Sequence, residues 1–242
     1  AADTEWAPIN PEDPEGMQWS VIDGNPGEGA FVGLVKMPAG YATPVHSHPA
    51  NFLGVALAGT ALNGRSAEDH RLIPPGTVWT EPAGEVHFTG CTEEADCIFV
   101  GHMDGAIGMN PAEGPMEGDM QMTATALEDM SFVPVNPDAP GGPAAFVFEG
   151  EMEAGPFRAL VSYPAGASSP EHTHSASYSG VVLGGELAHG QADAMGPGSS
   201  WTEVGGDAHV TSCVSEETCF FLVSFQGAFD MVPVAPVEAP VE

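Results

Sequence analysis

The chain of 242 residues carries one stretch twice, and this duplication constrains its fold more than any other feature. Residues 38–59 read PAGYATPVHSHPANFLGVALAG, and residues 164–185 read PAGASSPEHTHSASYSGVVLGG, so the offset from position 38 to position 164 is 126. Each copy holds two histidines one residue apart. On an extended segment such a pair projects to one face, because side chains on a strand alternate with period two. These histidines are His46 and His48 in the first copy, and His172 and His174 in the second.

A third histidine follows later in each copy, at the end of GTVWTEPAGEVH (His87) and of GSSWTEVGGDAH (His209). If strand pairing brings it to the earlier pair, three imidazoles converge, and imidazole nitrogen is a common ligand of divalent transition metals. The sequence therefore predicts two metal sites, formed by His46, His48 and His87 and by His172, His174 and His209. The alternative is that all six are core histidines satisfied by hydrogen bonds in a barrel that holds no metal.

The same residues resemble the cupin family. Its first motif reads G-x5-H-x-H, then three or four residues, a Glu, six residues and a Gly, and its second reads G-x5-P-x-G-x2-H. Gly40–Gly59 and Gly76–His87 match with every Gly, Pro and His in register, and Gly166–Gly185 and Gly198–His209 match except for Val204 in place of Pro. The resemblance covers most of the chain and implies a bicupin, with the histidines pointing into each barrel. The residues beyond these motifs resemble an uncharacterised bicupin family.

The carboxylate ligand of the first motif is missing from both copies. Its place is taken by Phe52 and Tyr178, each separated by six residues from the motif's last Gly. Oxalate decarboxylase and germin, cupins that rely on manganese and this Glu, are therefore poor functional models. Three neutral imidazoles suit zinc, copper, nickel and ferrous iron better than manganese or magnesium. We expect zinc first, and three-histidine cupins such as the thiol dioxygenases imply iron as an alternative.

Three further residues are candidates for catalysis. Glu81 and Glu203 occupy matched places in the WTE sequence of each copy and could ligate the metal or act as general bases to a bound water. They could equally be ordinary acids on a solvated face. Tyr178 differs from its counterpart Phe52 by a hydroxyl that could donate to a ligand, which favours the second copy as the catalytic one. His189 is matched by Asn63, so we expect it to be an ordinary surface or hydrogen-bonded histidine outside the shared site.

The four cysteines form matched pairs, in CTEEADC at residues 91–97 and in CVSEETC at residues 213–219. Each pair brackets a short polar segment between strand-like segments, which places two residues opposite one another in a hairpin. Two disulfides, Cys91–Cys97 and Cys213–Cys219, are therefore expected, and they would imply an oxidising compartment. Metal ligation is the alternative, because Cys91 and Cys213 each follow a site histidine by four residues.

The fold class follows from the pattern of short segments. Val-, Phe- and Thr-rich runs cut by Gly and Pro, without a convincing amphipathic helix, predict an all-β sandwich or barrel. Together with the resemblance this gives two tandem jelly-roll cupin domains related by a pseudo-two-fold axis. We expect cupin domain 1 at residues 5–112, a linker at 113–130, cupin domain 2 at 131–234 and an extended tail at 235–242.

Charge limits the partners. With 34 acidic and 4 basic residues the formal net charge is -30, so the surface repels nucleic acid and anionic membranes. No apolar run is long enough to span a bilayer. The start AADTEW, without an initiator Met, is consistent with removal of a signal peptide, although a trimmed chain would look the same. With the cysteines, this favours a periplasmic or secreted protein whose partner is a small molecule, and leaves a homo-oligomer open.

Two function classes remain. The first is a metalloenzyme acting on a small oxygenated or anionic molecule, as a dioxygenase-like oxidoreductase, an isomerase or a hydrolase. The second is a non-catalytic protein that binds, senses or stores a metal or a small ligand. No nucleophile triad or phosphate-binding loop is found in the sequence.

Overall fold

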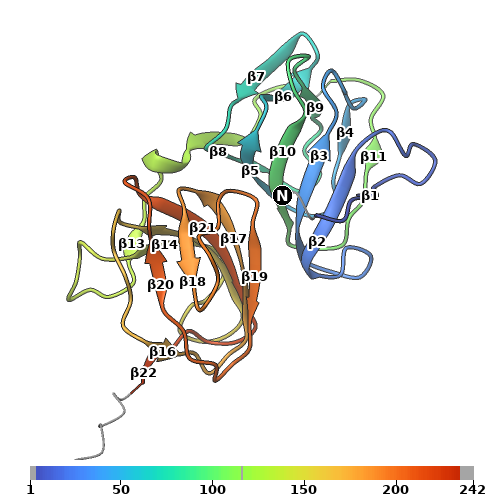
Figure 1. The fold of residues 1–242 in the computed structure, drawn as a ribbon. Coiled ribbons are helices and arrows are strands. Elements are labelled where there is room, and N and C mark those ends of the chain that lie inside the picture. Colours follow the sequence, from blue (N-terminus) through green and yellow to red (C-terminus); the bar gives the residue numbers. More distant parts are fainter. Residues whose placement is uncertain (1–3, 116, 235–242) are drawn as a thin grey trace, which may run out of the picture. The chain divides into compact units, whose positions relative to one another are not determined.

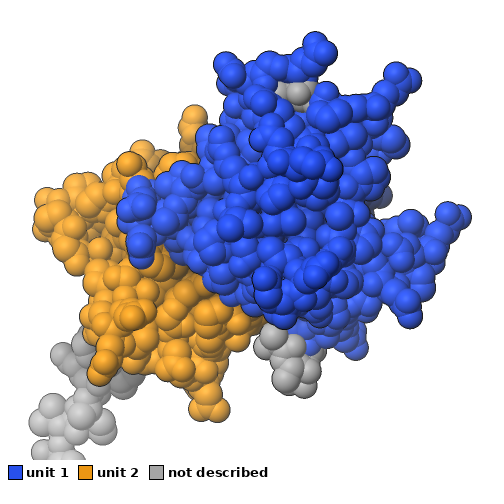
Figure 2. Space-filling model, turned by 90° about the horizontal axis from the view of Figure 1, so that it is seen from above, with its two compact units in different colours: residues 1–130 blue, residues 131–242 orange. Residues whose placement is uncertain are grey.

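The computed structural model describes residues 4–115 and 117–234 and divides the chain into two compact units, Ala1–Met130 and Ser131–Glu242. We call them unit 1 and unit 2 (Figures 1 and 2). The predicted tail at 235–242 lies outside the described residues. Among the described residues the structure contains strands, turns and one turn of 3-10 helix, and the all-β prediction is confirmed.

Unit 1 is built on a seven-stranded sheet in the order β1-β2-β3-β10-β5-β8-β12, with a three-stranded sheet β7-β6-β9 and a two-stranded sheet β11-β4. The paired strands run antiparallel. The elements are β1 (Ala7–Pro8), β2 (Gln18–Gly24), β3 (Phe31–Met37), β4 (His46–Ser47), β5 (Phe52–Ala58), β6 (Ala61–Ser66), β7 (Asp69–Ile73), β8 (Thr77–Glu81), β9 (Phe88–Cys91), β10 (Cys97–Met103), β11 (Asn110–Pro111), β12 (Thr123–Ala126) and the 3-10 helix η1 (Leu127–Asp129).

Unit 2 repeats this plan with a six-stranded sheet in the order β13-β14-β15-β21-β17-β19 and two pairs, β18-β20 and β16-β22. Each of its strands has a counterpart in unit 1 at the same place in the sheet order, as the sequence repeat predicts. The elements are β13 (Val133–Pro134), β14 (Ala144–Gly150), β15 (Phe157–Tyr163), β16 (His172–Thr173), β17 (Tyr178–Gly184), β18 (Leu187–His189), β19 (Ser200–Glu203), β20 (Thr211–Cys213), β21 (Cys219–Phe225) and β22 (Val232–Pro233).

The segment 113–130, expected as a linker, contributes to unit 1. Its strand β12 pairs with β8, Thr123 opposite Thr80 and Ala126 opposite Thr77, and its Leu127 is buried. The TATA sequence of β12 suits an edge strand, because threonine is favoured in strands and small side chains fit against a neighbouring strand. The boundary between the units therefore falls at Met130, at the end of this segment.

A glycine and a tryptophan fix the same strand contact in both units. Gly54 lies opposite Trp79 across β5 and β8, and Gly180 lies opposite Trp201 across β17 and β19. A Cβ on Gly54 would lie 2.3 Å from the indole, and one on Gly180 would lie 2.2 Å from it. Only glycine leaves room for the ring at this position, so these pairs set the spacing of the strands that carry Glu81 and Glu203.

Both predicted disulfides are confirmed. Cys91 bonds to Cys97 and Cys213 to Cys219, with Cα–Cα distances of 5.8 and 5.7 Å. Each bridge joins the two strands that flank a short turn, and this excludes the alternative in which the cysteines ligate a metal. Among the described residues, no helix has the length and apolar character needed to cross a bilayer.

Candidate metal centres

Backbone pairing places the first and third histidines of each copy side by side. His46 and His87 exchange two backbone hydrogen bonds, of 2.9 and 2.8 Å, and His172 and His209 exchange two of 3.0 and 2.9 Å. His48 and His174 lie two residues further along the chain, just past the ends of β4 and β16, and on the same face as His46 and His172. The two-residue spacing and the strand pairing together bring each set of three imidazoles into one cluster, in which the ligand atoms lie within 4.8 Å of one another.

In unit 1 each of the three rings is oriented by a main-chain carbonyl. The Nδ1 atoms of His46, His48 and His87 contact the carbonyl oxygens of residues 44, 108 and 85 at 2.8, 2.7 and 3.0 Å. A carbonyl only accepts hydrogen bonds, so the network assigns the proton of each neutral ring to Nδ1. The unprotonated Nε2 atoms are then free for the cluster, which is the arrangement typical of metal-ligating histidines.

Glu81 completes this cluster. It lies at the end of β8, is only 3% exposed, and directs Oε2 toward the rings at 3.2 Å from His87 Nε2 and 3.7 Å from His48 Nε2. Its Oε1 accepts hydrogen bonds from Asn63 Nδ2 at 2.5 Å and Trp79 Nε1 at 3.1 Å. The carboxylate is therefore held by two donors on one oxygen and faces the imidazoles with the other.

The contact between Glu81 Oε2 and His87 Nε2 is one that a bound cation could stabilise. His87 Nε2 is buried and makes no hydrogen bond, although the carboxylate oxygen is close enough for one. In the neutral ring assigned above, two electron-rich atoms face each other at 3.2 Å, and burial makes such a pair costly. A divalent metal between them would accept both lone pairs. The donor set of three imidazoles and one carboxylate fits a transition metal.

Unit 2 repeats the orientation of the rings. The Nδ1 atoms of His172 and His209 contact the carbonyl oxygens of residues 170 and 207 at 2.8 and 3.2 Å, and His174 Nδ1 forms a short contact to the carbonyl of Asp230. Asp230 is itself fixed, because its carboxylate accepts hydrogen bonds from the amide and hydroxyl of Ser175. The Nε2 atoms of His172 and His174 are again left for the cluster, whereas that of His209 has a further contact, described below.

The surroundings of this second cluster differ from those of the first. The Tyr178 hydroxyl lies 3.2 Å from His209 Nε2 and donates to it. Glu203 does not approach the three rings as Glu81 does: its Oε2 accepts a 2.8 Å hydrogen bond from His189 Nε2, and its Oε1 lies 3.8 Å from His209 Nδ1. The ring of His189 is buried, and its Nδ1 contacts the hydroxyl of Thr211 at 2.9 Å.

Burial favours the neutral form of three of the clustered imidazoles. Desolvation lowers the pKa of His46 to about 4 and lowers the pKa of His172 and His174 below the ordinary value. These three rings therefore have free lone pairs near neutral pH, as metal binding requires. Burial also raises the pKa of Tyr178, so its phenol keeps its proton and remains a hydrogen-bond donor.

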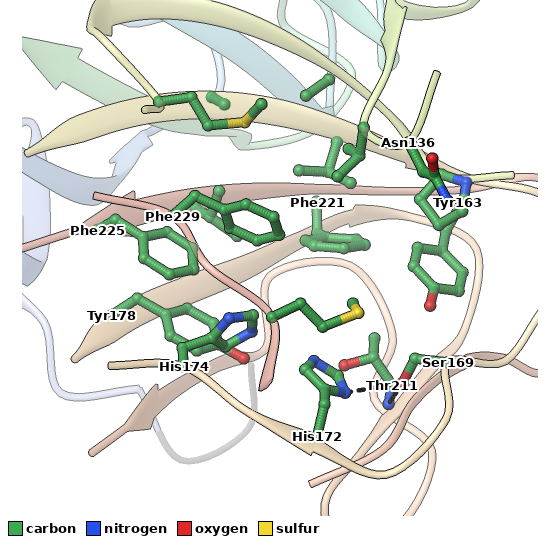
Figure 3. Close-up of a pocket in the computed structure, with 18 of the residues that line it drawn as sticks. Asn136, Tyr163, Ser169, His172, His174, Tyr178, Thr211, Phe221, Phe225 and Phe229 are labelled. Atoms are coloured by element: carbon green, nitrogen blue, oxygen red, sulfur yellow. Dashed lines mark hydrogen bonds between the residues drawn. The ribbon is translucent and has the colours of Figure 1, made fainter. Parts of the chain in front are cut away.

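The second cluster opens into a cavity of about 460 Å³ inside unit 2. Figure 3 shows His172, His174 and Tyr178 on its wall, with Phe225 and Phe229 beside His174. The wall is mainly aromatic and aliphatic, and the ring of Phe225 stacks on that of Tyr178 with centroids 4.5 Å apart. The remaining polar groups are few; they include Tyr163, Ser168, Ser169, Thr211 and the exposed Asn136.

The structure thus brings the three predicted histidines of each unit together and places a glutamate near each triad. The two glutamates, to which the sequence gives the same candidate roles, have different contacts. Glu81 faces the triad of unit 1, whereas Glu203 is bound to His189. His189, expected as a surface or hydrogen-bonded histidine outside the shared site, is hydrogen-bonded and is not one of the three clustered histidines, but it is buried, at 5% exposed, and its ring centroid is 4.7 Å from that of His209. Strand pairing brings it there, since His189 on β18 lies opposite Thr211 on β20, just as Asn63 on β6 lies opposite Thr89 on β9.

The β-sheet architecture and the paired histidine clusters define the molecule as a bicupin. More narrowly, the chain belongs to the family described as "Domain of unknown function (DUF4437)", whose model matches residues 1–135. A second model, described as "ChrR Cupin-like domain", matches residues 120–229. No protein of curated function matches the chain in sequence.

Solved structures support the fold assignment. A candidate dioxygenase from Nostoc punctiforme PCC 73102 matches with a TM-score of 0.66 and 12% identity over 91% of this chain and 78% of its own. A cupin 2 conserved barrel domain protein from Leptotrichia buccalis gives 0.57 and 13% over 87% and 88%. A tryptophan-to-tyrosine variant of Bacillus subtilis oxalate decarboxylase gives 0.54 and 13% over 96% and 78%. At these identities the likeness shows the cupin fold alone.

Proposed function

We propose that this protein is a metal-dependent enzyme in which the two barrels have different tasks. Unit 1 holds a divalent transition metal through His46, His48, His87 and Glu81 as a structural site. Unit 2 holds a metal through its three histidines as the reaction centre. The observation that carries the proposal is the 460 Å³ cavity whose wall includes His172 and His174, two of the three clustered imidazoles of unit 2.

The donor sets support this division of tasks. Structural zinc sites have four protein ligands, whereas catalytic sites have three and keep a position for water or substrate. Unit 1 offers four buried or half-buried donors, with Glu81 as the fourth. Unit 2 offers three, because Glu203 is hydrogen-bonded to His189. We expect zinc in unit 1 and zinc, iron, copper or nickel in unit 2.

The cavity indicates the class of substrate. Its walls suit an apolar body, aromatic or branched aliphatic, of the size of a small metabolite. A metal held by neutral imidazoles keeps its full charge and supplies Lewis acidity to an oxygen donor such as a carboxylate or an enolate. The Tyr178 hydroxyl, next to His209, can donate a hydrogen bond to that group. Glu203, which lies beside His209 and is paired with His189 behind the cavity wall, is the candidate base for a proton that leaves through this cluster.

Oxidation of the dioxygenase type fits this pocket best. Hydrolysis or isomerisation of a polar metabolite requires many hydrogen-bond donors around the substrate, and the wall of this cavity offers few. Such an oxidation requires a redox-active metal in unit 2, which we expect to be iron. The structural likeness to the candidate dioxygenase of Nostoc agrees with this class.

A non-catalytic binding or sensing protein is the second candidate. One observation favours it: the Tyr178 hydroxyl covers His209 Nε2, the atom through which His209 would bind a metal. In that case unit 2 would bind a small apolar molecule in its cavity without turning it over. The two disulfides support an oxidising compartment for either function, and we propose a periplasmic or secreted location.

Elemental analysis and oxygen uptake test the proposal. The purified protein should carry two metal ions per chain. After reconstitution with ferrous iron, it should consume oxygen with at least one member of a panel of small aromatic and aliphatic molecules that bear a carboxylate or an enolisable ketone. His172→Ala should abolish this uptake, while His70→Ala, a change at an exposed histidine of β7, should leave it unchanged. Binding of panel members without turnover by any reconstituted form would favour the binding protein.

A further inference from the structure

We infer that the residue at position 63 in unit 1 and 189 in unit 2 decides whether the glutamate of the WTE sequence can reach the metal. This inference rests on the proposed metal sites. In unit 1 the residue is Asn63 and Glu81 faces the three imidazoles, whereas in unit 2 it is His189 and Glu203 does not. His189 is thus a positioning residue that keeps unit 2 open for substrate.

The two positions are equivalent in the backbone. Asn63 lies opposite Thr89 across β6 and β9, and His189 lies opposite Thr211 across β18 and β20. Each side chain also bonds to its opposite threonine: Asn63 Nδ2 to the hydroxyl of Thr89 at 3.2 Å, and His189 Nδ1 to that of Thr211 at 2.9 Å. The scaffold around the residue is therefore the same, and the side chain is what changes.

The glutamates begin from equivalent positions as well. Glu81 lies opposite Phe52 across β5 and β8, and Glu203 lies opposite Tyr178 across β17 and β19. Asn63 binds Glu81 through Oε1 and leaves Oε2 to the cluster. The longer imidazole of His189 reaches Glu203 Oε2 through Nε2, while its Nδ1 stays on the threonine. The histidine therefore engages the carboxylate that its counterpart in unit 1 leaves directed at the cluster.

The indole that donates to Glu81 in unit 1 makes no hydrogen bond to the glutamate in unit 2. In unit 1 Trp79 Nε1 donates to Glu81 Oε1 at 3.1 Å. The matched Trp201 is buried at its Nε1 atom and interacts with the Tyr178 side chain, not with Glu203. A carboxylate released from His189 would therefore find an indole donor at the position that the carboxylate occupies in unit 1. Glu203 is also 16% exposed in its side chain, against 4% for Glu81.

The test is a mutant cycle on the full chain with the site of unit 1 silenced by His46→Ala and His48→Ala. Zn²⁺ affinity is measured by competition with a chromophoric chelator, and the visible spectrum of bound Co²⁺ reports the coordination. Four forms are compared: the background itself, Glu203→Gln, His189→Asn, and the two changes together. His189→Asn should tighten Zn²⁺ binding about tenfold and change the Co²⁺ spectrum, because a carboxylate joins the three imidazoles.

Glu203→Gln should have little effect while His189 is present, and should remove the whole gain when combined with His189→Asn. His189→Asn combined with Tyr178→Phe in the same background reproduces the unit 1 residues at both positions and should give the largest gain. The reciprocal change Asn63→His, with unit 2 silenced by His172→Ala and His174→Ala, should weaken Zn²⁺ binding and make Glu81→Gln nearly neutral.

Three outcomes would overturn the inference. Equal effects of Glu203→Gln with and without His189→Asn would show that His189 does not control the carboxylate. Weaker Zn²⁺ binding after His189→Asn would mark His189 as a ligand, in the trio that it forms with Glu203 and His209. Absence of Co²⁺ binding in every form would refute the metal site of the proposed function as well, whereas the first two outcomes leave that site intact.

Discussion

Replacing Tyr178 with phenylalanine should make unit 2 bind a metal more tightly. The Tyr178 hydroxyl donates to His209 Nε2 at 3.2 Å, and this nitrogen is the atom that would coordinate a metal. The ion must therefore displace the hydroxyl before His209 can act as a ligand. Unit 1 already has Phe52 at the matched position, so the change introduces a residue that the same scaffold tolerates.

The size of the effect follows from the burial of the acceptor. Tyr178 is 4% exposed and His209 is 3% exposed, so without the hydroxyl Nε2 of the metal-free protein becomes a buried acceptor with no donor. Such a loss costs about 1–3 kcal/mol. In the metal-bound protein the lone pair of Nε2 is used by the ion, and the cost vanishes. Comparison of the metal-free and metal-bound forms of the two proteins therefore gives two predictions for Tyr178→Phe. The metal-free variant should be destabilised by about 1–3 kcal/mol, and its Zn²⁺ affinity should be raised about 5- to 150-fold.

Urea unfolding of the metal-free protein and chelator competition with unit 1 silenced measure the two sides of this cycle. Tyr41→Phe serves as the control, because it also removes a phenol hydroxyl, but one that contacts Asp13 in unit 1 at 3.3 Å. A weaker Zn²⁺ affinity after Tyr178→Phe would refute the reasoning, since it would mean that the phenol itself binds the ion.

Three other predictions concern stability. In the metal-free protein burial holds the pKa of His46 at about 4, against 6.5 in the unfolded chain, so acid protonates the unfolded chain first. The free energy of unfolding should therefore fall by up to about 3 kcal/mol as the pH drops from 6.5 to 4. Equal urea midpoints at about pH 7 and pH 5 would contradict this prediction. Replacing Cys91 and Cys97 by serine should cost about 2 kcal/mol of loop entropy, visible as a lower melting temperature under oxidising but not reducing conditions. Gly180→Ala should cost about 1–3 kcal/mol, because its Cβ would lie 2.2 Å from the indole on β19, while Gly155→Ala, which meets nothing within 4 Å, should be neutral in the same unfolding assay.

The fold and the histidine clusters were largely predictable, because the spacing of residues within the repeated segment determines which side chains share a face. Period-two spacing places His46 and His48 on one face, and this needs no knowledge of the rest of the chain. The hairpin cysteines follow the same logic. The strand within the segment 113–130 could not be recognised from the sequence, because the segment lacks the alternating pattern of a half-buried strand. Its strand β12 lies at the edge of the sheet, where pairing on one side and small side chains suffice.

The glutamates could not be placed from the sequence, since their direction depends on contacts between strands. Glu81 and Glu203 have the same neighbours, WT before them, and lie at the same register opposite Phe52 and Tyr178. What separates them is a side chain on another strand, 18 positions away in unit 1 and 14 in unit 2. A comparison of motifs alone treats residue 189 as a position where the two copies simply differ, because Asn63 matches it. The place of His189 beside His209 is therefore not evident from the motifs.

The duplication makes each unit the reference for the other. Features present in both, such as the imidazoles with Nδ1 bound to carbonyls and the tryptophan packed on a glycine, belong to the scaffold and hold the cluster together. Features present once must account for any difference in metal affinity or activity between the units. Two pairs of matched positions carry such differences. At positions 63 and 189, Asn63 binds Glu81 and His189 binds Glu203. At positions 52 and 178, only Tyr178 has a hydroxyl that contacts the third histidine. Since the backbone at these positions pairs identically, a difference in chemistry between the barrels should follow these side chains when they are exchanged.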